Sequence, residues 1–193
     1  MMTPLKTLRQ ILKQFRADAA GVAAVEFALV VPVMLLLYVG SVEASTLISM
    51  DRRVQTIAGS VGDLVSRSNI KIAACDIKDY FQASSAIMAP YPSNNLGQVV
   101  SSIYVKPDGT TEVKWSQSVG GATALTVGNA YELPKEMTDI ARDAYVIVAT
   151  AAYAYTPLSG VVYDHPIHLR RENFYLPRFG GSIVIDPTTT TSC

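Results

Sequence analysis

Glu26 is the residue whose chemistry stands out first, because it carries the only charge in an apolar run from residue 19 to residue 42. A carboxylate within a lipid-facing segment costs about 2.5–3.5 kcal/mol on insertion scales and therefore usually has a partner. If the chain is cut after Gly21, the new α-amino group of Val22 lies one helical turn from Glu26 and can pair with it in a neighbouring subunit. In an uncut chain, Glu26 would lie at the lipid headgroup level, where the start of a helix favours acidic groups.

Cysteine is the next candidate for chemistry, and the chain has two, Cys75 and Cys193. Disulfides persist in oxidising extracytoplasmic compartments. A Cys75–Cys193 bridge would hold the threonine-rich tail against the folded domain and contribute about 2–4 kcal/mol. We prefer this bridge, and two unpaired thiols are the alternative.

The remaining reactive side chains form no diagnostic motif. His165 and His168 flank Pro166, but a metal site needs further ligands at characteristic spacing, so both are predicted to be loop histidines. The sequence has no phosphate-binding loop, nucleophile elbow or zinc-protease helix. We therefore expect no enzymatic activity, cofactor, metal or small-molecule substrate.

Charge is distributed unevenly around the apolar run. Residues 1–21 carry a net charge of +3 and the remainder of the chain carries −3. Basic residues beside a membrane segment stay on the cytoplasmic side, so this pattern predicts a cytoplasmic N-terminus. The later basic pairs have acidic neighbours, and nucleic-acid binding is not expected.

The run itself is long enough to cross a membrane as a helix. Phe27–Val42 has no charged residue, and about 20 residues span a hydrocarbon core of roughly 30 Å. Pro32 within it predicts a kink in a packed helix bundle. Three interpretations compete: a leader cut after Gly21, an uncut signal anchor, and a secretory signal cut after Val42-Glu43-Ala44. The long basic segment and long apolar run fit the secretory signal poorly.

A family resemblance favours the first interpretation. The run Gly21-Val22-Ala23-Ala24-Val25-Glu26-Phe27-Ala28-Leu29-Val30-Val31-Pro32 resembles the amino-terminal signature of TadE-like proteins, minor pilins or pseudopilins of tight-adherence (Flp, type IVb) pili. Weaker resemblance continues in Val146–Ala149, Tyr153–Leu158 and Tyr175–Arg178. The chain departs from the family pattern of major Flp pilins at Phe27, where they usually have Tyr, and carries Asp18 close to the cut.

The resemblance implies a function in pilus assembly. An aspartic prepilin peptidase would cut between Gly21 and Val22, and Glu26 would pair with a neighbouring subunit. The implied partners are this peptidase, other minor or major pilins, the pilus assembly platform and membrane lipid. The chain would cross the inner membrane once and could enter a pilus. The alternatives are an uncut bitopic protein whose extracytoplasmic domain binds another envelope component, and a secreted domain released after Ala44.

Four regions are predicted: a basic leader (1–21), a transmembrane helix (22–42), an amphipathic extension of it (43–68) and an extracytoplasmic α+β domain (69–193). Apolar residues recur at steps of three and four from Leu47 to Val65, which predicts one helix face packed on a domain. The fold class is therefore α+β, with a long N-terminal transmembrane helix that continues along a small antiparallel sheet, as in pilins.

Within the domain, Asp76 is predicted to cap a second helix that ends before Pro90 and Pro92. The other predicted elements are ordered along the chain as follows: strands Gln98–Val105 and Thr111–Ser116 joined by a hairpin connection, an exposed loop over 116–127, a short helix from Pro134 to Ala141, a central strand Tyr145–Tyr155 and a final strand Ser182–Ile185.

Overall fold

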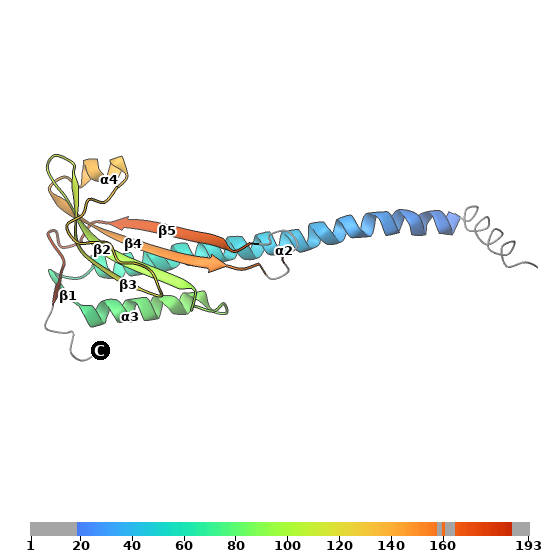
Figure 1. Cartoon of the computed structure of the whole chain (residues 1–193), viewed down its shortest axis with the longest axis horizontal. Helices are drawn as coiled ribbons and strands as arrows, with labels where there is room; N and C mark the ends of the chain where they lie inside the picture. The colour runs from blue at the N-terminus through green and yellow to red at the C-terminus, as the bar shows by residue number, and fades with distance from the viewer. Residues whose placement is uncertain (1–18, 158–159, 161–164, 187–193) are drawn as a thin grey trace, which may run out of the picture.

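One helix dominates the structure, a computed structural model that describes residues 19–157, 160 and 165–186. Helix α2 (Ala19–Ser66) is 48 residues long and continues through Pro32. Its N-terminal half projects away from the rest of the molecule, whereas its C-terminal half lies along a sheet (Figure 1). This arrangement confirms the predicted α+β class with a long apolar helix followed by a small antiparallel sheet.

The sheet has four antiparallel strands in the order β3-β2-β4-β5. These strands are β2 (Leu96–Val105), β3 (Thr111–Val119), β4 (Ala144–Tyr155) and β5 (Ile167–Tyr175). β2 and β4 are the central pair and run against each other from Leu96↔Tyr153 to Val105↔Ala144. Alternate residues of each strand point to opposite faces, so one face packs on the helices and the other packs beneath a long connecting segment.

The packed half of α2 buries a regular stripe of side chains against β4 and β5. Met50, Val54, Ile57, Val61 and Val65 are each 2% exposed or less. Their steps of three and four residues place them on one helix face. Full burial of such side chains contributes roughly 1.5–3 kcal/mol each, so this stripe is a main source of domain stability.

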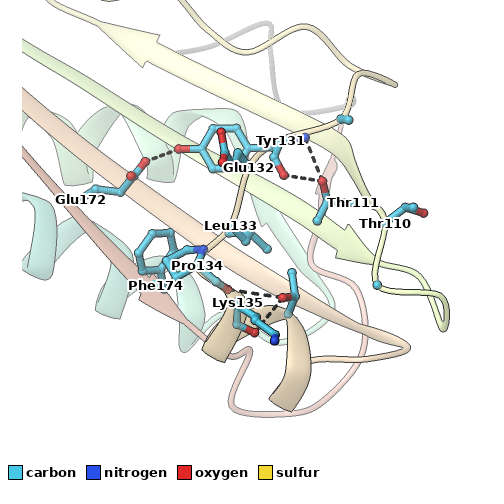
Figure 2. Close-up of a pocket in the computed structure, with 12 residues that line it drawn as sticks. Thr110, Thr111, Tyr131, Glu132, Leu133, Pro134, Lys135, Glu172 and Phe174 are labelled. Atoms are coloured by element: carbon cyan, nitrogen blue, oxygen red, sulfur yellow. Dashed lines mark hydrogen bonds between the residues drawn. The ribbon is translucent and has the colours of Figure 1, made fainter.

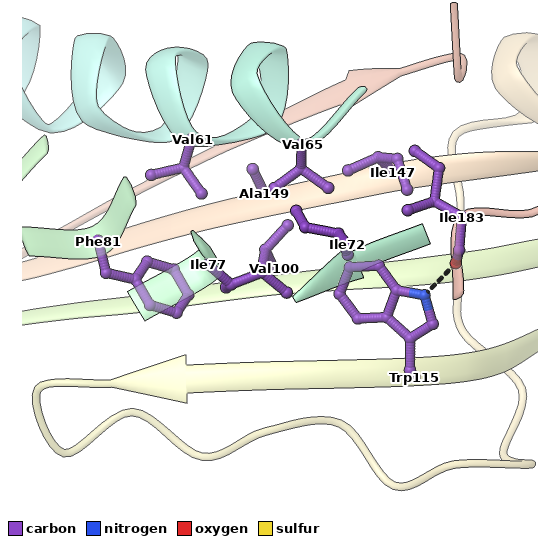
Figure 3. Close-up of a cluster of buried hydrophobic side chains, with 10 residues drawn as sticks. All are labelled: Val61, Val65, Ile72, Ile77, Phe81, Val100, Trp115, Ile147, Ala149 and Ile183. Atoms are coloured by element: carbon purple, nitrogen blue, oxygen red, sulfur yellow. Dashed lines mark hydrogen bonds between the residues drawn. The ribbon is translucent and has the colours of Figure 1, made fainter. Parts of the chain in front are cut away.

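A second helix completes the layer over the same face of the sheet. α3 (Ala74–Ser85) and the short 3₁₀ helix η1 (Ala86–Met88) lie beside α2. Met88 of η1 packs in one apolar cluster with Met50, Val54 and Tyr153. The apolar side chains between α3, α2 and the sheet form another cluster (Figure 3). Within it, the Trp115 indole N–H donates to the carbonyl of Ile183 at 2.6 Å. The buried Gln98 side chain accepts from Ser84 Oγ at 2.6 Å and donates to the Phe81 carbonyl at 3.1 Å.

Polar contacts join α2 to β5 and to the segment that follows it, at every fourth residue of the helix. Four helix residues advance about 6 Å and two strand residues about 6.6 Å, so the two repeats nearly match. The contacts are Arg171 to Asp51 (2.8 and 2.6 Å), Gln55 to Asn173 (2.9 Å), Tyr175 Oη to the Gly59 carbonyl (3.0 Å) and Arg178 to Asp63 (2.7 Å). Hydrogen bonds from Arg67, and then from Arg178, hold the pKa of Asp63 below its usual value.

The opposite face of the sheet is covered by the segment that connects β3 to β4. Val113 N–H donates to the Asn129 carbonyl at 2.9 Å, and Gly128 N–H donates to the Val113 carbonyl at 2.8 Å. Leu133 is buried there, and Leu125 and Tyr131 are partly buried. The prediction of an exposed loop over 116–127 is therefore wrong in part, because β3 extends to Val119 and Leu125 packs against the sheet. α4 (Lys135–Ile140) forms within the predicted short helix.

Three further expectations differ from the structure. Asp76 is the third residue of α3 rather than its cap, and its carboxylate accepts from the Ala73 N–H at 3.4 Å. The final strand β6 (Val184–Asp186) pairs in parallel with β1 (Lys71–Ala73) in a separate two-stranded sheet. Strand β5 was not predicted, because its sequence IHLRRENFY has no clean apolar alternation.

Gly62 is expected to be intolerant of a side chain. A Cβ there would lie 2.5 Å from Tyr175 Cε2 and 3.0 Å from Ala149 Cβ, and the Tyr175 ring is held by its bond to Gly59. Gly62→Ala should therefore destabilise the domain by about 1–3 kcal/mol. The measurement is urea unfolding of the full chain in detergent, followed by the fluorescence of Trp115, the only tryptophan.

Gly59→Ala is the matched control. Its Cβ would meet no atom closer than 3.5 Å, and replacing a helical glycine with alanine stabilises by roughly 0.5–1 kcal/mol. Equal unfolding midpoints for the two variants would contradict the packing of Tyr175 on Gly62.

Candidate functional site

The predicted processing and pairing residues lie on the half of α2 that the domain does not cover. Gly21 is half-exposed, Val22 is 52% exposed and Glu26 is exposed. Val22 and Glu26 are four residues apart and therefore share one helix face, about 6 Å apart along the axis. The side chains of Val22 and Glu26 therefore lie on the same side of one helix, facing outward, where a neighbouring chain can reach them.

The side chains on both sides of Glu26 in the sequence form an apolar surface around the helix. Large hydrophobic residues are exposed on all sides of α2 as far as Val42: Val22, Val25, Phe27, Leu29, Val30, Val33, Met34, Leu35, Leu36, Leu37, Tyr38 and Val42. A contiguous apolar surface of this kind marks a membrane or protein contact. Among the residues that the structure describes, α2 is the one helix long and apolar enough to cross a membrane.

Glu43 marks the junction between this surface and the domain. It is only 4% exposed and lies four residues before Leu47 and seven before Met50, in line with the packed stripe. Beside it lies a cavity of about 410 Å³ whose lining includes Met50, Tyr91, Tyr153 and Tyr155. Burial, and then the charge of Glu43, raise the pKa of Tyr155.

In the sequence, Glu43 belongs to the candidate secretory cleavage site Val42-Glu43-Ala44, which the structure places within the uninterrupted helix. Its position on the three-and-four repeat is the signal that could have identified it as a residue that faces the domain. The tyrosines around it, Tyr91 before β2 and Tyr153 and Tyr155 at the end of β4, lie far from Glu43 in the sequence.

A second hollow lies on the opposite face of the sheet, beside α4 (Figure 2). Its polar groups bind one another: the Tyr131 phenol donates to the Glu172 carboxylate, which also accepts from Thr150 Oγ1 at 3.1 Å. Burial, together with the Glu172 hydrogen bond, raises the pKa of Tyr131. These contacts fasten the connecting segment to β4 and β5. We therefore interpret the hollow as part of the packing between that segment and the sheet, and not as a ligand site.

The other predicted residues are not brought together. Cys75 lies in the first turn of α3, whereas Cys193 is outside the described residues, so the bridge stays a prediction. His165 and His168 are both exposed, and no cluster of three metal-ligating side chains occurs within the described parts of the chain. The kink at Pro32 also stays a prediction.

An exposed apolar helix that continues into the core of an α+β domain indicates a single-pass membrane protein. The family model described as TadE-like protein matches residues 21–60. This match confirms the resemblance recognised in the motif at residues 21–32, and it includes both the apolar half of α2 and most of the packed stripe. No curated protein and no solved structure matches the chain.

A charge in the middle of the apolar half should impair membrane insertion. Leu35 is 58% exposed, and an arginine at the centre of a transmembrane helix costs about 2.5–3.5 kcal/mol on insertion scales. Leu35→Arg should therefore lower the fraction of the full chain that resists alkaline carbonate extraction from membranes.

Ile48→Arg provides the matched control, because Ile48 is similarly exposed, at 54%, but follows Glu43 on the aqueous side. This variant should remain in the membrane fraction as the unaltered chain does. Equal extraction of the two arginine variants would show that the apolar half does not span the bilayer.

Proposed function

We propose that this chain is a minor pilin or pseudopilin that contributes to the assembly of a tight-adherence, type IVb pilus. Its N-terminus lies in the cytoplasm and its α+β domain lies outside the inner membrane. It acts as a structural subunit and not as an enzyme. The TadE-like match over residues 21–60 supports a pilus-related role, and the architecture of α2 supports a subunit that packs through its helix.

The observation that carries the proposal is the division of α2 into an apolar exposed half and a half fixed to the sheet. From Val22 to Val42 no residue of the helix is buried, whereas one face of it is buried from Met50 to Val65. The apolar half can exchange lipid for the helices of neighbouring subunits without any change in the domain. The domain then moves with the helix, because the two share one core.

Processing would prepare this helix for assembly. Cleavage after Gly21 leaves Val22–Ser66 as the helix and lies far in sequence from the first residue packed on the domain, Glu43. The cut would therefore not disturb the folded part. It would create an α-amino cation on the helix face that carries Glu26, and this cation would offset the cost of a carboxylate within the membrane.

The first test is the N-terminus of the mature protein. Co-expression with a prepilin peptidase should yield a chain that begins at Val22, as measured by N-terminal sequencing and intact mass. Gly21→Leu should leave the leader in place, since the peptidase needs a small residue at the cut. Gly40→Leu, a glycine exchange elsewhere in the same helix, should be processed normally.

Other outcomes identify the alternatives. An intact leader in the presence of an active peptidase would support the uncut bitopic protein that binds an envelope component. A chain that begins at Ser45 would support the secreted domain, and either result would contradict processing as a prepilin.

The second test separates cleavage from pairing. Glu26→Ala should still be cut after Gly21 but should bind pilin partners about tenfold or more weakly, since a charged hydrogen bond is worth about 1.5–3 kcal/mol. Co-purification from detergent-solubilised membranes measures this association. The control is Glu136→Ala, which removes an exposed carboxylate from α4. Unchanged association of the Glu26 variant would eliminate its proposed pairing role.

A further inference from the structure

The cavity beside Glu43 lies where α2 leaves the membrane. The 21 residues from Val22 to Val42 rise about 31 Å as a helix, which matches a hydrocarbon core of roughly 30 Å. Glu43 therefore lies at the level of the lipid headgroups. β4 runs along α2 toward the membrane-spanning half (Figure 1), so that its last residues, with Tyr153 and Tyr155, reach the same level.

The lining of this cavity combines an apolar wall with a buried carboxyl side chain. Glu43 is 4% exposed, and Tyr153 and Tyr155 are 5% and 6% exposed. Tyr91 contributes a third phenol ring from the connection between η1 and β2. The Tyr153 hydroxyl donates to the Pro92 carbonyl at 3.2 Å, which joins β4 to that connection. The site is thus formed by three segments of the chain that already contact one another.

This combination favours a cation. Aromatic faces attract ammonium and guanidinium groups, and a desolvated carboxylate strengthens that attraction. The Tyr91 ring already has a cation of the chain itself on one face, because the guanidinium of Arg53 lies 5.6 Å from its centre. Burial, and then the charge of Glu43, raise the pKa of Tyr155, which lines the same cavity.

We propose that the cavity binds the ammonium headgroup of a membrane phospholipid, with phosphatidylethanolamine as the ligand class. Lipid headgroups are the ammonium source present at this depth around any single-pass protein. The volume of about 410 Å³ lies within the usual range for small ligands. The exposed helix surface that precedes Glu43, which includes Tyr38 and Val42, would carry the acyl chains.

The test measures lipid retention by the full chain with its leader intact, so that it is independent of processing and pilus assembly. The protein is purified in detergent, mixed with equal amounts of palmitoyl-oleoyl phosphatidylethanolamine and phosphatidylglycerol, and examined by native mass spectrometry. We expect the unaltered chain to retain phosphatidylethanolamine about tenfold over phosphatidylglycerol. Equal retention of the two lipids would overturn the proposal.

Variants locate the site. Glu43→Gln should abolish the preference, whereas Glu172→Gln, an exchange on the opposite face of the sheet, should preserve it. Tyr155→Phe should retain binding because the ring remains, and Tyr155→Leu should weaken it. Unfolding of each variant, followed by Trp115 fluorescence, separates loss of the site from loss of the fold.

A different occupant would give a different result. If carbodiimide cross-links Glu43 to a lysine of a second protein in native membranes while phosphatidylethanolamine shows no preference, the cavity holds a protein side chain and the lipid proposal is wrong. A preference that persists in both Glu43→Gln and Tyr155→Leu would also overturn it, because the lipid would then bind elsewhere.

Discussion

The nearly equal repeats of an α-helix and a β-strand govern how this molecule is built. Along α2, every fourth residue from Asp51 to Asp63 reaches β5 or the segment that follows it. Their partners are every second residue of β5, namely Arg171, Asn173 and Tyr175, and then Arg178 in the segment that follows β5. These contacts form only if the helix and the strand lie close together. Gly62 allows this close approach because it leaves room for the Tyr175 ring. This row of contacts between α2 and β5 also aligns the apolar stripe of α2 with β4.

The two halves of α2 face different surroundings, water in the C-terminal half and lipid in the N-terminal half. Its C-terminal half has an apolar stripe and a polar back, as a helix on a water-soluble domain requires. Apart from Glu26, its N-terminal half exposes large apolar side chains on every side as far as Val42, as lipid requires. Glu43 lies at the change between the two, and it faces the domain because it belongs to the same three-and-four repeat as Leu47 and Met50. One uninterrupted backbone therefore couples events in the membrane to the position of the sheet.

Much of this arrangement could be predicted from the sequence. The apolar run, the stripe from Leu47 to Val65 and strands β2, β3 and β4 follow from hydrophobic patterning, whereas the pairing of Val22 with Glu26 stays a prediction from the motif. β5 could not be found in this way, because Arg171 and Asn173 contact the polar side chains Asp51 and Gln55 instead of an apolar core. The cavity at Glu43 was missed for a related reason. Its tyrosines lie some fifty to one hundred and ten positions further along the chain, and only the fold brings them together.

The row of polar contacts between α2 and β5 also determines how the protein bears mechanical load. A pull on the membrane end of α2 acts parallel to the helix and the strand, so the contacts at Asp51, Gln55, Gly59 and Asp63 are loaded in shear. Bonds loaded in shear must give way together, whereas bonds that are peeled apart from one end break in turn. The same geometry that positions the sheet therefore makes the helix and the domain a single tension-bearing unit, with force passing from the membrane into the core through a row of side chains.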